Sequence, residues 1–216
     1  MGSATSRRTK GLRVAALCGA AVVGSVGLGV AGVARGGGDE RAHGAALAEL
    51  RDASGNRIGT ARFLARPGGI MRVKVDVAGL APGFHGFHVH ATGQCVAPFG
   101  VAPFATAGGH QHSGTQTHGT HAGDLPPLLV LNDGTASARF ETDALTLAQL
   151  LDSGGDGSAL IVHAGRDNLA NIPARYHSHV PDASSTTFGP DATTLATGDA
   201  GVRVGCGVVE RSRQGD

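Results

Sequence analysis

Histidine is the residue type whose number and spacing most clearly predict chemistry in this chain. Seven of the eleven histidines lie in residues 83–124, where Asp124 is the one carboxylate. Imidazole and carboxylate groups gathered at this density are ligands that zinc and copper prefer in proteins. Aromatic residues make up only 4% of the chain, so the histidines are not part of a general enrichment in rings. The segment predicts a metal site, which we interpret as a redox site on a β scaffold.

The first ligand pair is His88-Val89-His90. Side chains alternate between the two faces of a strand, so these two imidazoles project from the same face, as one metal ion requires. By the same parity His85 faces away from them, and we expect it to pack or to form hydrogen bonds. A short pattern of this kind also occurs as a solvated pair, so it depends on further ligands.

A second cluster supplies such ligands. It consists of His110, His112, His118 and His121 with Asp124, which is more than one tetrahedral zinc ion requires. Either a second metal or spare histidines must therefore be considered. His163 ends an apolar run, where a lone histidine is more often structural, but with the first pair it could complete a set of three imidazoles.

The scaffold that positions these residues reads as short strands separated by turns. Val73, Val75 and Val77 alternate with charged residues, a period of two that marks a half-buried antiparallel strand. The predicted strands cover residues 45–51, 58–65, 71–77, 128–131, 135–141 and 159–163, with a possible helical turn at 146–151. This pattern predicts an all-β sandwich or barrel. Two long irregular stretches, 91–127 and 164–201, are expected to be functional or held by a metal or a disulfide.

The first 34 residues predict export. Four basic residues precede an uncharged run rich in Ala, Gly and Val, which is typical of a signal peptide; the run is also long enough to remain as an uncleaved membrane anchor. Residues 35–44 form a polar linker. The remaining part, about 180 residues, is long enough for one domain with a core. It contains two cysteines, Cys95 and Cys206, for which we expect a disulfide in an exported protein. A net charge of +1 argues against binding nucleic acid.

Several motifs, in this order, resemble the copper/zinc superoxide dismutases over residues 45–210, with 211–216 left as a tail. They are Gly83-Phe84-His85-Gly86-Phe87-His88-Val89-His90, Gly108-Gly109-His110, His121-Ala122-Gly123-Asp124-Leu125, Val162-His163, and the run from Thr197 to Val208. The resemblance implies a Greek-key β-sandwich or flattened barrel with two long functional loops.

The resemblance also implies roles for individual residues. Copper would be held by His88, His90, His110 and His163, and zinc by His110, His118, His121 and Asp124, so that His110 bridges the two metals. Asp167 matches a carboxylate that links the two metal sites, and Arg203 matches a cation that attracts and positions the substrate anion. Cys95 and Cys206 match the family's disulfide.

One departure from the family concerns the zinc ligands. His118 and His121 are only three residues apart, whereas the family usually has a longer segment between the corresponding histidines. His112 is an extra candidate that could replace His118. Because His121-Ala122-Gly123-Asp124 is intact, we expect zinc as well as copper. Loop histidines His177 and His179 could form a third site, although solvated side chains are the simpler interpretation.

The implied activity is dismutation of superoxide to oxygen and hydrogen peroxide by a redox-cycling copper ion, with His110 delivering a proton. This activity would protect the cell envelope from extracellular superoxide, and the enzyme would be a monomer or a homodimer. Two other functions predict different observations. A copper store or delivery protein has no need of Asp167 and Arg203, and a structural envelope protein with an inactive site would lack ligands.

Overall fold

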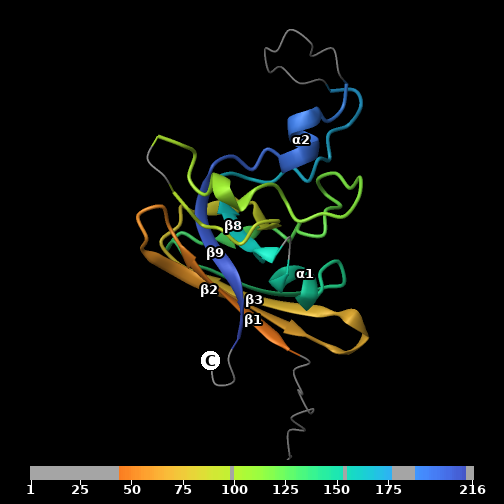
Figure 1. Ribbon diagram of the computed structural model, residues 1–216. Helices are drawn as coiled ribbons and strands as arrows, with labels where there is room; N and C mark the ends of the chain where they lie inside the picture. The colour runs from red at the N-terminus through yellow and green to blue at the C-terminus, as the bar shows by residue number, and fades with distance from the viewer. Residues whose placement is uncertain (1–43, 98–99, 153–154, 177–187, 213–216) are drawn as a thin grey trace, which may run out of the picture. The chain divides into compact units, whose positions relative to one another are not determined.

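The fold of this protein is almost entirely β (Figure 1). The computed structural model describes residues 44–97, 100–152, 155–176 and 188–212. Within them lie the strands β1 (Ala45–Arg51), β2 (Arg57–Ala65), β3 (Met71–Val77), β4 (Gly83–His85), β5 (Phe87–His90), β6 (Leu128–Val130), β7 (Ala136–Thr142), β8 (Ala159–His163) and β9 (Arg203–Arg211). The short helices are η1 (Pro67–Gly69), η2 (Ala105–Ala107), α1 (Leu147–Leu151) and α2 (Ala192–Thr197). The predicted all-β class is confirmed.

Seven strands form one antiparallel sheet in the order β5-β8-β9-β1-β2-β3-β7, and β4 pairs with β6 in a separate two-stranded ribbon. Sequence-distant strands are therefore neighbours: β5 pairs with β8, and β8 with β9. The six predicted strands agree with β1, β2, β3, β6, β7 and β8 to within one residue at each end. The predicted helical turn is α1, whose N-cap Thr146 forms a capping box with Gln149.

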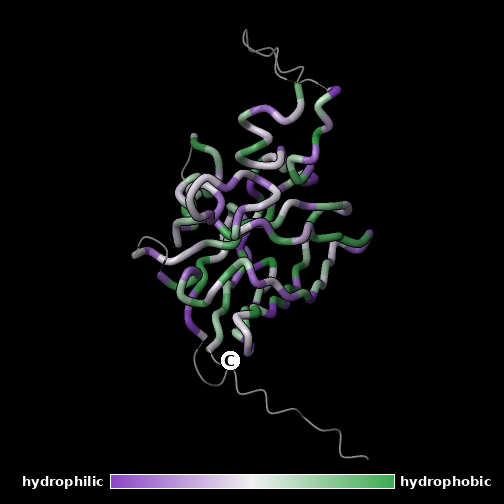
Figure 2. Tube along the Cα trace, turned by 90° about the vertical axis from the view of Figure 1, so that its right-hand side faces the viewer, coloured by the Kyte–Doolittle hydropathy of each residue, from purple (hydrophilic) through white to green (hydrophobic). Residues whose placement is uncertain are grey.

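The core lies on the inner face of the sheet. On β3, Met71, Val73, Val75 and Val77 are buried while the residues between them face outward, as the alternation predicts. Figure 2 shows hydrophobic and hydrophilic segments following one another along the trace. Strand β9 does not show this alternation of apolar and polar residues, because Gly205 and Gly207 interrupt its apolar residues. A Cβ at Gly207 would lie 2.6 Å from the carbonyl oxygen of Glu49, so the close approach of β1 explains the glycine.

Some sequence-based expectations fall outside the described residues. These are the export segment 1–34, the linker as far as residue 43, the loop histidines His177 and His179, and the end of the tail at 213–216. In the part of the chain that the structure describes, no helix has the length and apolarity needed to cross a membrane.

Candidate metal centre

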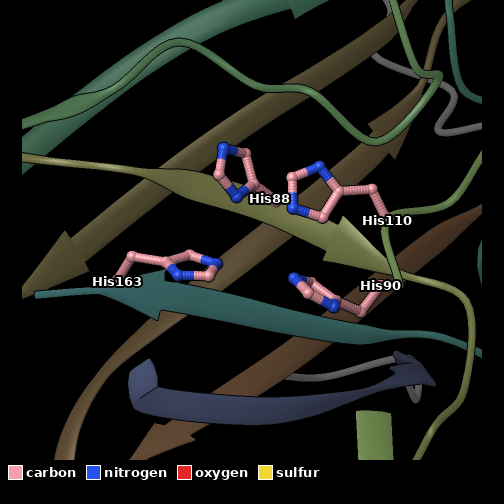
Figure 3. Close-up of side chains that lie close together, drawn as sticks. All are labelled: His88, His90, His110 and His163. Atoms are coloured by element: carbon pink, nitrogen blue, oxygen red, sulfur yellow. The ribbon is translucent and has the colours of Figure 1, made fainter. Parts of the chain in front are cut away.

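Four imidazoles converge beside the pair β5 and β8 (Figure 3). His88 and His90 project from the same face of β5, and His163 is the last residue of β8. His110 arrives from the long segment after β5 and forms an isolated bridge with His90. All four side chains are at most 4% exposed. One nitrogen from each ring lies within 4.8 Å of the others, so the four could hold one metal ion.

Hydrogen bonds determine which nitrogen of each ring is available as a ligand. His90 donates from Nδ1 to the carbonyl oxygen of Gly108 (2.9 Å), and His163 donates from Nδ1 to that of Gly201 (2.8 Å). His88 donates from Nε2 to Asp167 (2.5 Å). Each bond places the proton on one nitrogen and leaves a lone pair on the other.

The other nitrogens of these rings are His88 Nδ1, His90 Nε2 and His163 Nε2, and each is buried with no hydrogen-bond partner among the described residues. A buried polar atom without a partner is costly unless something else satisfies it. Three such lone pairs beside His110 fit a metal that imidazole binds, such as copper.

A second set of ligand atoms surrounds Oδ1 of Asp124. His110 Nδ1 lies 2.8 Å from it, His118 Nδ1 3.2 Å and His121 Nδ1 3.4 Å. Ligands about 2.0–2.1 Å from a tetrahedral zinc ion are about 3.3 Å apart, so these separations fit one zinc ion. His121 Nδ1 is itself buried without a partner among the described residues, because the hydrogen bond of this ring goes from Nε2 to the carbonyl oxygen of Gln116.

Around Asp124, the four residues whose ligand atoms all lie within 4.8 Å of one another are His88, His110, His118 and Asp124, with His88 in the place of His121. We prefer His121 because Nε2 of His88 is engaged by Asp167 and its free Nδ1 belongs to the first set. His110 contributes Nδ1 to the second set, and its ring centre lies 4.1 Å from that of His88. This ring therefore stands between the two sets.

Backbone amides orient the Asp124 carboxylate. Its Oδ2 accepts hydrogen bonds from the amides of Gly119 (2.7 Å) and His121 (3.0 Å), which leaves Oδ1 toward the imidazoles. Burial opposes ionisation, but the hydrogen bonds with His110 and His118 outweigh it and hold the pKa of Asp124 far below its usual range. The carboxylate is therefore ionised at neutral pH, as a zinc ligand must be.

Two further pKa shifts reflect the position of His118 between two carboxylates. Burial disfavours its charged form, yet Asp124 and Asp167 together raise the pKa of His118 to about 9. The pKa of Asp167 is correspondingly lowered by His118 and His88 against the effect of burial.

In the first set, which converges beside β5 and β8, three imidazoles have pKa values that are lowered and not raised. Burial lowers the pKa of His88, lowers that of His90 well below its usual value, and lowers that of His163 to about 3. These three rings are consequently neutral at physiological pH. A neutral imidazole is the form that binds a metal.

Arg203 is the cationic side chain next to the first set. It lines a cavity of about 490 Å³ together with His90, His110 and His163. Its guanidinium donates from Nη1 to the carbonyl oxygen of Phe104 (2.6 Å) and from Nη2 to that of Gly108 (2.5 Å). Burial lowers the pKa of Arg203, but a guanidinium remains charged. A fixed cation at this cavity can attract and orient a small anion.

The predicted disulfide is confirmed. Cys95 and Cys206 are bonded, with their Cα atoms 5.6 Å apart across 111 residues of sequence. The bridge attaches the start of the long segment after β5 to β9. Because the same segment supplies the two carbonyl acceptors of Arg203, the disulfide helps to hold the arginine in place.

The structure separates the histidines of the second cluster. His118 lies in the set around Asp124, whereas His112 is exposed and belongs to neither set. His85 is buried and contacts the carbonyl oxygens of His163 and Ala81 rather than a ligand set, as expected, although it ends a separate strand, β4. Sequence reasoning missed Gly198, where a Cβ would lie 2.2 Å from both Asp167 Oδ1 and His118 Nε2. The sequence signal that could have identified Gly198 is its position beside Asp199 in the motif from Thr197 to Val208.

Comparisons with known proteins agree with this geometry. The family model for copper/zinc superoxide dismutase matches residues 57–209. A "Superoxide dismutase [Cu-Zn]" of Mycobacterium tuberculosis is 45% identical over 164 residues, which cover 72% of this chain and 65% of that protein. The protein of the same name from Mycolicibacterium paratuberculosis is 42% identical, covering 74% and 71% of the two chains. Among solved structures, the clock protein EA4 matches with a TM-score of 0.59 and 24% identity over 77% of this chain and 93% of that one, a likeness of fold.

Proposed function

Because this chain belongs to the copper/zinc superoxide dismutase family, we propose that it catalyses the dismutation of superoxide to oxygen and hydrogen peroxide. The observation that carries the proposal is the set of three buried imidazole nitrogens without partners, next to His110 and beside a cavity lined by Arg203. A second set of ligand atoms around Asp124, which shares His110 with the first set, accounts for the other metal of the family.

The ligand assignments are supported by four imidazole nitrogens without partners among the described residues and by the atoms grouped around Asp124. We assign copper to His88, His90, His110 and His163, and zinc to His110, His118, His121 and Asp124. Copper, when bound, supplies one-electron chemistry because imidazole ligands support both its cupric and its cuprous state. The net reaction consumes two superoxide anions and two protons and yields one oxygen and one hydrogen peroxide molecule.

The protein's own groups attract the anion, orient it and supply a proton. Arg203 performs the first two tasks, since its guanidinium is held by two carbonyl oxygens and therefore keeps a fixed direction at the cavity. We assign proton delivery to Nε2 of His110, which would carry a proton only while it does not hold copper, because Nδ1 of this ring is engaged at Asp124 and the ring lines the same cavity. A general acid in this position has a short path to the product.

We also propose that residues 45–210 form the dismutase domain of an exported protein, with residues 1–34 as the export segment or an anchor and 35–44 as a linker. Two observations support this location. The Cys95–Cys206 disulfide is of a kind that persists in oxidising compartments, and the N-terminal residues have the basic and apolar pattern of an export signal. In that place the enzyme protects the cell envelope from extracellular superoxide.

The decisive experiment is a superoxide consumption assay on the copper- and zinc-loaded full chain, with and without a copper chelator. We expect fast consumption that the chelator abolishes and added copper restores. Metal analysis of the same preparation should find one copper and one zinc per chain. Consumption that is absent from fully copper-loaded protein would overturn the proposed activity, and copper without zinc would overturn the second assignment alone.

A further inference from the structure

His112 has no place in either ligand set, yet it lies at the edge of one of them. The three histidines assigned to zinc, His110, His118 and His121, are 3–7% exposed, whereas His112 is an exposed residue of the same loop. A hydrated zinc ion arriving from solvent meets exposed groups before buried ones, so an exposed imidazole at the edge of the site is the first ligand for which it can exchange water.

The distance between His112 and His121 is suited to such an exchange. Their ring centres are 5.6 Å apart. The ring centres of the imidazole pairs assigned to zinc are separated by 5.1 Å (His110 and His118), 5.4 Å (His110 and His121) and 5.9 Å (His118 and His121). The two rings are therefore as close as the ring pairs that we assign to one zinc ion.

The backbone holds His112 in this position. The preceding residue, Gln111, donates its amide to the carbonyl oxygen of Val89 in β5 and accepts at its own carbonyl from Gly123, both across 2.8 Å. His112 therefore directly follows a residue whose backbone is hydrogen-bonded to Val89 on one side and to Gly123 on the other.

The turn that follows connects His112 to His121. The side chain of Gln116 accepts from the amide of Ser113 (2.9 Å), and the carbonyl oxygen of Gln116 accepts from His121 Nε2 (3.2 Å). This bond keeps the proton of His121 on Nε2 and its lone pair on Nδ1, the atom that faces Asp124. The exposed His112 and the buried His121 therefore belong to one hydrogen-bonded turn.

We propose that His112 is an entry ligand for zinc: it captures the aqueous ion at the surface and passes it to His121, from which the ion moves into the four-ligand site. In the capture step one water leaves the ion as an imidazole nitrogen binds, with no change of oxidation state. His112 is absent from the final coordination sphere, so it determines how fast zinc binds and not how tightly. This inference rests on the proposed zinc site.

The test is the kinetics of zinc binding by the metal-stripped full chain. Zinc is mixed rapidly with wild-type protein, His112→Ala and the loop control Thr115→Ala, and its uptake is followed by competition with a chromophoric zinc indicator. We expect the association rate of His112→Ala to fall by about 3- to 10-fold. Equilibrium stoichiometry and affinity should be unchanged, and Thr115→Ala should bind at the wild-type rate. His112→Asp, which keeps a zinc-binding atom, should recover most of the rate.

The results of this experiment distinguish a failure of the entry role of His112 from a failure of the proposed zinc site. An unchanged association rate in His112→Ala would overturn the entry role while leaving the zinc site intact. Loss of zinc at equilibrium in His112→Ala would also overturn it, because His112 would then be a permanent ligand. If the wild-type chain binds no zinc, the proposed zinc site itself is wrong.

Discussion

Nε2 of His118 donates a hydrogen bond to Oδ1 of Asp167 across 2.7 Å, and both side chains are fully buried. The other oxygen of the same carboxylate accepts from His88. One buried carboxylate therefore links a ligand assigned to zinc with a ligand assigned to copper. It fixes the proton on Nε2 of both rings and so leaves Nδ1 of each available to the metal proposed for it.

Asp167→Asn tests this link. The amide has the shape of the carboxylate but carries no charge, and its nitrogen cannot accept from one of the two imidazoles. We expect zinc affinity to fall by about 10- to 100-fold while copper is retained, because a site of nitrogen ligands binds Cu²⁺ more tightly than Zn²⁺. Competition with a zinc chelator measures the affinity, and metal analysis measures the copper. The exposed control Asp143→Asn should bind both metals normally; equal zinc affinity in the two variants would contradict the role of Asp167.

Arg203→Ala tests attraction of the anion. Without the guanidinium, the cavity keeps its histidines but loses its fixed cation, so we expect the superoxide rate to fall by about tenfold or more and to depend less on ionic strength. Copper content should be unchanged. The comparison is Arg139→Ala, which removes an exposed arginine on β7. If the rate and its salt dependence survive in Arg203→Ala, the cation has no part in attracting the substrate.

Zinc binding should depend on pH through His118. In the metal-free chain the pKa of this ring is about 9, so at neutral pH it carries a proton that zinc must displace. The pKa values of Asp124 and Asp167 are lowered and that of His121 is lowered by burial, so these groups are already deprotonated. We therefore expect zinc affinity to rise by about one logarithmic unit per pH unit between about pH 7 and pH 8.5, and to level off above about pH 9.

Calorimetry in buffers of different ionisation enthalpy measures the proton release directly. The expected value near neutral pH is about one proton per zinc ion, and His112→Ala should give the same value because the entry ligand does not remain bound. Zinc affinity that is independent of pH over this range would show that His118 enters the reaction neutral, and would remove the raised pKa as a feature of the site.

The local sequence pattern identifies the pair on strand β5, but it does not distinguish the histidines of the loop from one another. His88 and His90 share a face because β5 has a period of two, whereas His85 lies apart from them because it ends the separate strand β4. His112 and His118 lie in a loop without a period, so no local pattern distinguishes them. His118 is placed by its amide, which donates to the carbonyl oxygen of Leu195 across 2.7 Å in helix α2. That partner is 77 residues away in the sequence, and neither residue type identifies the contact.

The choice of nitrogen on each ring was also beyond sequence reasoning. Nε2 is free on His90 and His163 because the carbonyl oxygens of Gly108 and Gly201 accept from Nδ1. Both carbonyls belong to irregular backbone, whose direction follows from the folded loops and not from side-chain type. The resemblance to a family supplied the distant partners His163, Asp167 and Arg203, which periodicity alone does not connect to β5.

Gly198→Ala tests how closely helix α2 must approach the link between His118 and Asp167. Gly198 has φ +61°, and a Cβ there would lie 2.2 Å from Asp167 Oδ1 and from His118 Nε2. Both atoms are buried and engaged in the hydrogen bond between them, so neither can move without weakening it. We expect a loss of about 1–3 kcal/mol in the free energy of unfolding from the clash, together with weaker zinc binding.

The matched control separates backbone strain from the clash. Gly68 also has a positive φ, +78°, but a Cβ there meets nothing within 4 Å. Gly68→Ala should therefore lose only the strain of the left-handed conformation, about 1–2 kcal/mol, and should bind zinc as the wild type does. Urea unfolding and chelator competition on both variants give the two quantities. Because only Gly198 faces the ligand link, a zinc defect confined to Gly198→Ala would locate the effect at that link, and equal zinc binding by the two variants would refute the close approach.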